Sequence, residues 1–253
     1  MEEYLNVAIK AAKEAGKIAL RRSYDLKISA KGSSGEIVTN ADIEAEQAIV
    51  ERLSSEFPNI GFVGEEKGFM PSNTGLLWIV DPIDGTRNYS IGIPFFCTSI
   101  ALVQNDEPLL GVVYEPNKDE IFYAIKGKHA YLNGEWIHVS KKESLDKAVA
   151  SMSFPLAKRV QELARCKLFS TYRYFGAVAL ELCYVACGRI DFMLHNNINP
   201  WDGAAGSIIV RQSGGVAVNQ QGRPWHISDR YLLASNSKLQ KEFMAKLPQE
   251  RLM

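Results

Sequence analysis

The sequence predicts a layered α/β fold, with a mostly antiparallel sheet in the first part and an α/β second part. Residues 95–139 contain three apolar runs separated by short turns (FFCTSIALV, LLGVVY and EIFYAI), which is the pattern of an antiparallel meander. Beyond about residue 140, strand-like and helix-like segments alternate, as they do in α/β units. The chain also opens with apolar residues at helical spacing, which predicts a long amphipathic helix at the start.

Two helices and two buried strands are expected before the meander. Apolar residues from Leu5 to Ala19 define the first helix, and Thr39 to Phe57 defines the second. Between them, SAKGSSGE has no period of its own and predicts a mobile loop between Ile28 and Val38, suited to a flap over a site. GFVGEE and LLWIVDPIDG each predict a short buried strand that runs into an acidic turn.

The second part is expected to pack closely against the first, with a cleft between them. We place the boundary near Ser140 to Leu145, which divides the chain into residues 1–142 and 143–253. The expected elements are a strand near Ala148 to Met152, a helix ending at Cys166, a strand near Lys167 to Thr171, a helix from Gly176 to Cys187, the strand IDFMLH, a helix after Pro200, and the strands GGVAVN and YLLASN.

Composition predicts a globular protein, and the start of the sequence predicts a cytoplasmic one. Of the 253 residues, 46% are hydrophobic, and the 29 Lys and Arg balance the 29 Asp and Glu. No net field therefore attracts nucleic acid. The start has no basic leader, and no apolar run approaches the roughly 18 residues of a membrane span. We expect neither a nucleic-acid partner nor a membrane partner.

Six acids stand at expected strand ends or helix starts, and together they predict a metal site. Hard cations such as Mg²⁺ take oxygen ligands, and two such ions close together activate a water and stabilise a leaving oxygen. A metal is also one way to hold several carboxylates together without strong repulsion. The six acids are Asp42, Glu65, Glu66, Asp81, Asp84 and Asp202.

The segment Asp81-Pro82-Ile83-Asp84-Gly85-Thr86 is the most specific of these signals. A buried strand delivers Asp81, and the turn returns Asp84 to nearly the same point. The amides of Gly85 and Thr86 then open a short helix, where they could hold a phosphate. Taken alone, this segment has a simpler interpretation as a turn with a helix-capping aspartate. The other acids have similar simple interpretations, but their conjunction favours a single site.

Four ordered motifs resemble those of the inositol monophosphatase family. They are V-T-N-A-D (Val38 to Asp42), G-E-E (Gly64 to Glu66), D-P-I-D-G-T (Asp81 to Thr86) and P-W-D-G-A-A-G (Pro200 to Gly206). The resemblance spans essentially the whole chain and implies an α/β layered sandwich of the sugar-phosphatase type. It also implies a Mg²⁺-dependent, lithium-sensitive phosphatase that forms a homodimer. The wider group includes fructose-1,6-bisphosphatases and nucleotide 3′-phosphatases.

The resemblance implies a ligand set for two to three Mg²⁺ ions. Glu65, Asp81 and the backbone carbonyl of Ile83 would hold the first ion. Asp81, Asp84 and Asp202 would hold the second, so that Asp81 bridges the two. A third, weaker ion would lie near Glu65.

The resemblance also implies how water and substrate are placed. Thr86 and Asp42 would orient and help to deprotonate the attacking water, and Glu66 would act through water. Lys31 belongs to the flap that closes over this region. The amides of Gly85 and Thr86 would hold the phosphoryl oxygens during direct in-line attack by a metal-activated water.

Two departures from the family pattern concern the substrate wall. His195 stands where animal inositol phosphatases carry a glutamate that contacts substrate hydroxyls, so it either binds substrate or only caps a strand end. Gly176-Ala177-Val178 replaces a segment resembling G-T-A, so one hydroxyl is missing from the wall. Both departures favour looser substrate discrimination than strict specificity for inositol.

Three functions are compatible with these residues. The first is hydrolysis of inositol 1-phosphate or a related sugar or polyol phosphate, with fructose 1,6-bisphosphate as a further substrate. The second is a nucleotide 3′-phosphatase or NADP phosphatase, which would need an adenine-binding wall that the sequence does not reveal. The third is a noncatalytic metal-binding regulatory homologue, which the complete set of acids and Thr86 disfavours.

Overall fold

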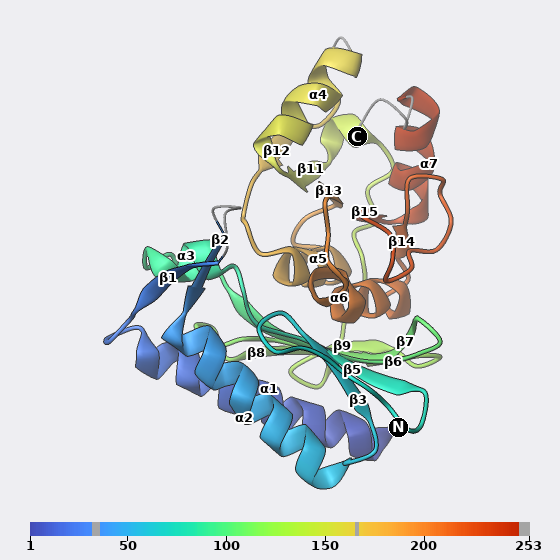
Figure 1. The fold of residues 1–253 in the computed structure, drawn as a ribbon. Coiled ribbons are helices and arrows are strands. Elements are labelled where there is room, and N and C mark those ends of the chain that lie inside the picture. The colour runs from blue at the N-terminus through green and yellow to red at the C-terminus, as the bar shows by residue number, and fades with distance from the viewer. Residues whose placement is uncertain (32–35, 165–166, 248–253) are drawn as a thin grey trace.

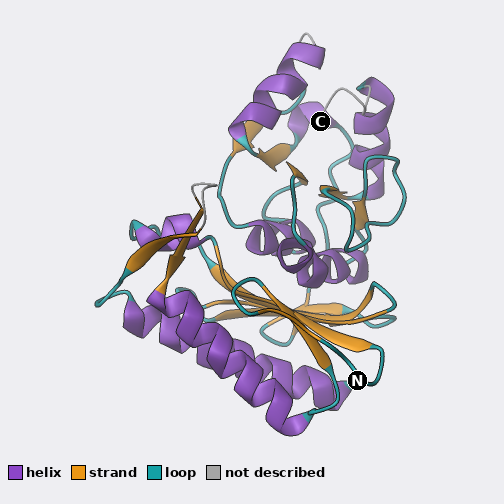
Figure 2. Cartoon of the chain, in the orientation of Figure 1, coloured by secondary structure: helices purple, strands orange, loops and turns teal. Residues whose placement is uncertain are grey.

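Helices and sheets alternate through the molecule in five layers (Figures 1 and 2). The computed structural model describes residues 1–31, 36–164 and 167–247. Helices α1 and α2 cover one face of an eight-stranded sheet, and α5 and α6 lie between that sheet and a five-stranded one. Helices α4 and α7 cover the far face of the second sheet. This arrangement confirms the predicted layered α/β fold.

The helices are α1 (Glu2–Arg22), α2 (Asn40–Glu56), α3 (Thr86–Ser90), α4 (Phe154–Ala164), α5 (Val178–Ala186), α6 (Pro200–Gln212) and α7 (Ser237–Lys246), with a 3₁₀ helix at Leu145–Lys147. The strands of the first part are β1 (Ile28–Lys31), β2 (Glu36–Thr39), β3 (Gly61–Gly64), β4 (Gly68–Met70), β5 (Leu76–Asp84), β6 (Cys97–Gln104), β7 (Glu107–Glu115), β8 (Glu120–Ile125), β9 (Ala130–Leu132) and β10 (Glu135–Trp136). Those of the second part are β11 (Val149–Met152), β12 (Thr171–Arg173), β13 (Phe192–Asn196), β14 (Val216–Val218) and β15 (Tyr231–Ser235).

The first sheet has the order β10-β9-β8-β7-β6-β5-β3-β4. Among its described strands β3 and β5 pair in parallel, and the other neighbours pair antiparallel, as predicted. Because side chains alternate along a strand, Trp78 and Val80 pack toward α1 and α2, while Ile79 packs toward α5 and α6. The strand that carries the predicted acids is thus buried on both faces.

The second sheet, β12-β11-β13-β15-β14, is mixed. Strand β11 pairs in parallel with β12 and β13, whereas β15 pairs antiparallel with β13 and β14. On its far face Phe169, Phe192 and Phe243 form an aromatic group, with ring centroids 4.8 Å apart for Phe192 and Phe243. On its near face Met193 packs into the core shared with α5 and α6.

Small residues bring α6 close to its neighbours. A Cβ atom on Gly206 would lie 2.5 Å from Leu182 of α5, and one on Gly203 would lie 2.7 Å from the Trp225 ring. On the sheet side, a Cβ on Gly111 of β7 would lie 2.5 Å from the carbonyl oxygen of Ala205. Because such contacts are too short for a real side chain, the glycines of the P-W-D-G-A-A-G motif are explained by close packing.

Several predicted elements need correction. The segment predicted as a loop between Ile28 and Val38 contains the antiparallel strands β1 and β2, while its residues 32–35 lie outside the described part. The strand predicted near Lys167 to Thr171 is wrong in position, because β12 covers Thr171–Arg173. The predicted helix end at Cys166 also lies outside the described residues. Strand β4 and helix α7 were not predicted.

The proposed boundary near residue 142 stays a prediction. Both α5 and α6 follow it in the sequence, yet they pack against the first sheet as well as the second. Within the described part of the chain, we find no helix with the length and apolar character that a membrane crossing requires.

Candidate active site

A β-bulge places Asp81 and Asp84 on the same face of the first sheet. Asp81 pairs with Ser99 and Asp84 pairs with Cys97, so three steps along β5 oppose two steps along β6. The extra residue restores the same side-chain direction after three positions instead of two. Pro82, which has no N–H to donate, occupies the bulge, and its carbonyl accepts the Thr98 hydroxyl at 2.9 Å. Both acids therefore lie on the face of the first sheet that packs against α5 and α6, and the shared metal site stays a prediction.

Asp84 reaches across to the N-terminus of α5. Its Oδ1 accepts the N–H of Val178 at 3.1 Å, and its Oδ2 accepts the N–H of Ala179 at 2.7 Å. These donors favour the charged carboxylate, but burial outweighs them and raises the pKa of Asp84 to about 7. The bonds join an acid of the first part directly to a helix of the second.

Asp81 lies at the centre of the acids. It is 2% exposed, and its Oδ1 accepts the N–H of Ile83 at 3.0 Å. Burial raises its pKa well above the usual range, and the charges of Glu65, Asp84 and Asp202 raise it further. Glu65 also has a raised pKa, chiefly from burial, and the charge of Glu66 adds to the effect. Several acids of the set are thus close enough to oppose one another's ionisation.

Asp202 is held at the start of α6. It is the third residue of the helix, and its Oδ2 accepts the N–H of the capping residue Asn199 at 2.8 Å. The Ser99 hydroxyl, opposite Asp81 on β6, donates to the carbonyl of Trp201 at 3.2 Å. Desolvation raises the pKa of Asp202 to about 8, and the charge of Asp84 adds to the effect.

Asp42 and Thr86 meet next to the bulge. Asp42 is completely buried in the first turn of α2, and its Oδ2 accepts the N–H of Thr39 at 2.8 Å. Its Oδ1 lies 3.2 Å from the Thr86 hydroxyl, which also lies 2.9 Å from the Ile83 carbonyl oxygen. Since a hydroxyl has one proton, Thr86 can donate to only one of them at a time. Burial raises the pKa of Asp42 to about 6.

The G-E-E turn is held by charges from two directions. The Lys31 ammonium lies 2.8 Å from Glu66 Oε1 and 3.2 Å from Glu65 Oε1, so the hairpin of β1 and β2 contacts the predicted metal ligands. On the side of α2, Glu46 accepts the N–H of Glu66 at 3.0 Å. A Cβ atom on Gly64 would collide with the Glu46 carboxylate, which explains the glycine.

The predicted substrate wall is built on bonds that were not expected. Gly176 and Ala177 donate their N–H groups to the buried Glu181, and the Nε2 atom of His195 lies 2.9 Å from the same carboxylate. His195 is itself 7% exposed. With the Val178 amide on Asp84, the backbone donors of this wall are already occupied. The structure therefore brings His195 close to the wall but gives it a protein partner.

Gly85 lies between the acids and this wall. Its φ angle of +94° favours glycine, and a Cβ atom there would lie 3.0 Å from the Cβ of Ala177. Asn88 of α3 closes the contact by donating to the carbonyls of Phe95 at 2.8 Å and Phe175 at 2.6 Å. The turn that follows Asp84 is thus fixed directly against the second part of the molecule.

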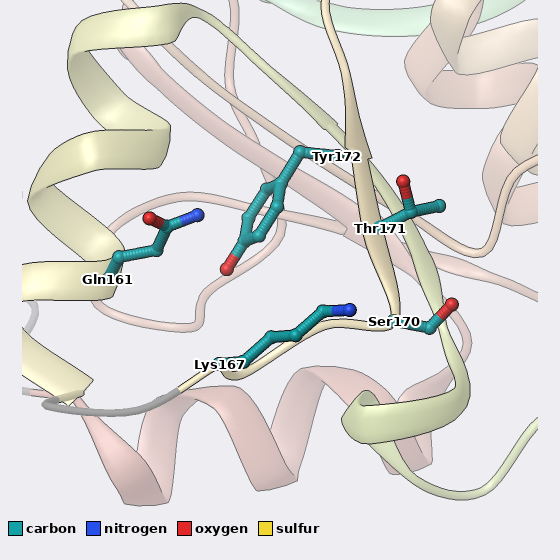
Figure 3. Close-up of a pocket in the computed structure, with 5 residues that line it drawn as sticks. All are labelled: Gln161, Lys167, Ser170, Thr171 and Tyr172. Carbon is teal, nitrogen blue, oxygen red and sulfur yellow. The ribbon is translucent and has the colours of Figure 1, made fainter.

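A small cavity of about 170 Å³ opens where these elements meet. It is lined by Glu36, Ile37, Glu65, Gly85, Thr86, Arg87 and Gly176. A larger pocket of about 450 Å³ lies between α4 and β12, and Figure 3 shows Gln161, Lys167 and Tyr172 around it. Its five lining residues include no acid, so it has no carboxylate to ligate a metal. The smaller cavity is the one that contacts the predicted site.

The acids suit a hard divalent cation. Among the described residues, no three His, Cys, Asp or Glu side chains directly enclose a single point. However, Mg²⁺ keeps several of its own waters and takes few protein ligands, so such an enclosure is not required. Burial and the neighbouring carboxylates raise the pKa values of Asp81 and Asp202. A bound cation would favour the ionised form of both and so offset this effect. The Ile83 carbonyl has a second lone pair beside the one facing Thr86. The residues therefore fit Mg²⁺.

Three residues that shape the site, Glu46, Glu181 and Asn88, were not predicted from the sequence. Glu46 lies four residues after Asp42 on the same helical face, so the periodicity of α2 could have revealed it. Glu181 is the single acid in the buried helix VALELCYVA, which is an unusual position for a charge. Asn88 has no comparable signal, because its partners lie 7 and 87 residues away.

Comparison with known proteins agrees with this geometry. Residues 1–252 match the inositol monophosphatase family. The chain is 36% identical to the Solanum lycopersicum protein named inositol monophosphatase 1, over 98% of this chain and 95% of that one. It is 33% identical to the Pasteurella multocida protein named Nus factor SuhB, over 98% and 96%. The structure resembles that of the Thermotoga maritima IMPase with a TM-score of 0.89 and 34% identity, covering 100% of this chain and 97% of that one.

The match covers the segments that carry Asp42, Glu65, Asp81 and Asp202 as well as the whole layered fold. Similarity over both sequence and structure at these levels establishes common ancestry and fold. The chain therefore belongs to the inositol monophosphatase family, whose members hydrolyse phosphomonoesters.

Proposed function

We propose that this protein is a Mg²⁺-dependent phosphatase that hydrolyses inositol 1-phosphate or a related small sugar or polyol phosphate. The observation that carries the proposal is the meeting of Asp81, Asp84 and Asp202 from β5 and α6 beside the Asp42–Thr86 pair. A noncatalytic homologue would have no need to keep this acid group and a paired Asp42 and Thr86, of which Thr86 lines the small cavity together with Glu65. Fructose 1,6-bisphosphate is a further candidate substrate, and a 3′-phosphorylated nucleotide or NADP is the alternative.

Two to three Mg²⁺ ions would be held by Glu65, Asp81, Asp84, Asp202 and the Ile83 carbonyl. When bound, such ions polarise the phosphoryl group, activate water and neutralise the charge of the leaving oxygen. Asp81 is central because it lies within electrostatic reach of the other three acids. Lys31, on the hairpin above Glu65 and Glu66, belongs to the flap over this region.

Thr86 and Asp42 would position the attacking water. When the Thr86 hydroxyl donates its hydrogen bond to Asp42, its lone pairs are left to accept a hydrogen bond from the attacking water. Asp42 is fixed by Thr39, so the acceptor that Thr86 would use in this arrangement has a fixed place. Glu66 would act on the same region through a further water. Positioning of this kind contributes much of the rate in phosphoryl transfer.

The phosphoryl group is proposed to enter the cavity lined by Gly85, Thr86 and Gly176. The rest of the substrate would then face Ala177, Val178 and His195. Since Glu181 and Asp84 already accept the amides of this wall, substrate contacts there would involve carbonyls and side chains. A wall with few open donors supports acceptance of several polyol phosphates.

The test is phosphate release at saturating Mg²⁺ from inositol 1-phosphate, fructose 1,6-bisphosphate, NADP and adenosine 3′,5′-bisphosphate. Asp84→Asn should abolish release, whereas Asp106→Asn, on an exposed turn, should leave it unchanged. The ranking of substrates would name the class. A folded protein that binds Mg²⁺ but releases no phosphate from any of the four would overturn the proposal.

Further properties are proposed from the family alone. We expect inhibition by lithium, a homodimer in solution and a cytoplasmic location. One relative is named a Nus factor, but the balanced charge of this chain gives no basis for nucleic-acid binding, and we propose that it has none. Light scattering of the purified protein and a binding titration with RNA at low salt would test the dimer and this absence.

A further inference from the structure

Glu181 is a buried carboxylate with four hydrogen-bond donors from three elements. Its Oε1 accepts the N–H groups of Gly176 at 3.0 Å and Ala177 at 3.4 Å. Its Oε2 accepts the Ser151 hydroxyl of β11 and lies 2.9 Å from Nε2 of His195 on β13. Glu181 and Ser151 are completely buried. The carboxylate therefore joins the second sheet to the segment that precedes α5.

His195 is the donor that matches this charge. An ionised carboxylate only accepts hydrogen bonds, so Nε2 must carry the proton that points to Glu181. Burial alone would lower the pKa of His195, but the charge and hydrogen bond of Glu181 outweigh it, and the pKa is raised. A buried carboxylate that loses such a donor is costly, because its oxygen would lack a hydrogen-bond partner.

Glu181 and Asp84 divide five consecutive backbone donors between them. The N–H groups of Gly176 and Ala177 point to Glu181, and those of Val178, Ala179 and Leu180 point to Asp84. Asp84 is a predicted metal ligand, whereas Glu181 is not. Burial is the main cause of the raised pKa of Asp84, and the charge of Glu181 adds to it. Asp84 therefore connects residues 178–180 to the predicted metal site, whereas Glu181 connects residues 176 and 177 to the second sheet.

We propose that Glu181 and His195 form a positioning pair that fixes the Gly176–Ala177 wall and thereby sets how tightly the non-phosphate part of a substrate is bound. This inference rests on the proposed function for its kinetic consequence but not for its structural one. Asp81, Thr86 and Asp42 stand on β5, α3 and α2, to which neither member of the pair belongs. Asp84 keeps its own three amide donors and Asp202 its bond to Asn199, so the reacting groups should keep their places when the pair is broken. His195 then acts through Glu181 and not as a direct substrate ligand.

The first experiment compares two substrates in three variants. His195→Leu removes the donor, His195→Gln keeps an N–H donor, and His138→Leu changes an exposed histidine as the control. For inositol 1-phosphate, His195→Leu should raise KM about tenfold, the equivalent of about 1.4 kcal/mol, with kcat within about threefold. For methyl phosphate, which has almost nothing to touch the wall, KM should stay unchanged. His195→Gln should restore most of the loss.

An equal loss of kcat/KM for both substrates in His195→Leu would overturn the proposal, since it would indicate a general structural defect. So would a KM increase in His195→Gln as large as that in His195→Leu. Should His195→Leu fail to fold, Ser151→Ala removes one donor from the same carboxylate and should raise KM for inositol 1-phosphate by about threefold.

The second experiment needs no catalysis and separates this inference from the proposed function. Amide hydrogen exchange in His195→Leu should speed up at Gly176 and Ala177 by about tenfold or more, while Val178 to Leu180 stay protected by Asp84. Unchanged exchange at Gly176 and Ala177 would overturn the positioning role. If the wild type releases no phosphate but the exchange pattern changes as stated, only the proposed function fails.

Discussion

The acids around Asp81 and the carboxylate of Glu181 are both buried, but they differ in the partners that surround them. Asp84 and Asp202 raise the pKa of Asp81, so these carboxylates oppose one another's ionisation. Glu181 has an imidazole 2.9 Å away and three further donors. Lys31 pairs with Glu65 at the edge of the first group, but Asp81, Asp84 and Asp202 form no ion pair within the described residues and suit an external cation. Glu181, in contrast, has its partner within the chain. Burial of a carboxylate therefore does not by itself indicate a catalytic role. A group of buried carboxylates without cationic partners is the better indication of a metal site.

The largest effect that would test this comparison is the loss of Asp81. Asp81→Asn should lower phosphate release by about 10³-fold or more, because it removes the proposed bridging ligand. In the absence of Mg²⁺ the variant should be at least as stable as wild type, since a neutral amide replaces a carboxylate that burial disfavours. Phosphate release and thermal unfolding in EDTA would measure the two quantities. Marked destabilisation of the metal-free variant would place Asp81 with Glu181 as a structural acid.

The second prediction concerns pH and Mg²⁺ together. The pKa values of Asp42, Asp84 and Asp202 are raised to about 6, 7 and 8, so the folded state binds more protons than the unfolded state over this range. The stability of the metal-free protein should therefore fall as pH rises from 6 to 8, by about 1–3 kcal/mol. Because cation binding favours the ionised acids, Mg²⁺ should stabilise the protein more at pH 8 than at pH 6.

Urea unfolding at both pH values, with Mg²⁺ and with EDTA, would measure these four stabilities. Ca²⁺ tests whether any hard cation suffices for stability. A stability that rises with pH in EDTA would contradict the raised pKa values and with them the claim that the charges are unmatched.

The smallest expected effect concerns the matched group. Ser151→Ala removes one neutral donor from Glu181 and should lower the free energy of unfolding by about 1–2 kcal/mol. Ser54→Ala, on the exposed side of α2, serves as the control and should change it by less than about 0.5 kcal/mol. Unlike the site acids, this loss should not depend on Mg²⁺. If Mg²⁺ restored the stability that Ser151→Ala loses, Glu181 would have to be counted with the acids of the metal site.

Motifs close in sequence were predictable, whereas contacts between distant segments were not. The D-P-I-D-G-T segment predicted that Asp81 and Asp84 share a face, and the bulge opposite Ser99 and Cys97 gives the reason. The small residues around Asp202 indicated a helix, but not that Gly203 and Gly206 pack against Trp225 and Leu182. Such partners follow from the layer order, which a single sequence does not specify.

His195 illustrates the same limit. Its position in a strand was predicted, but its partner Glu181 lies 14 residues away on a helix, and their separation depends on how α5 packs on the second sheet. The hairpin of β1 and β2 was missed because its strands are short and exposed and have no strong alternation. Helix α7 was missed, although Asn236 caps it with two hydrogen bonds from Lys238 and Leu239.

The contact of Gly111 with the backbone of Ala205 has a consequence for how this protein can diversify. Asp202 belongs to one part of the chain and Asp81 to the other, so their spacing depends on how near α6 lies to the first sheet. Because the backbones of β7 and α6 are in direct contact, the distance between them can hardly change. Contacts through long side chains, in contrast, could be repacked in many ways. The distance between Asp81 and Asp202 is thereby protected from substitutions elsewhere. Substitutions in the wall at residues 176–178 can then alter which substrates are accepted while the spacing of the acids stays constant.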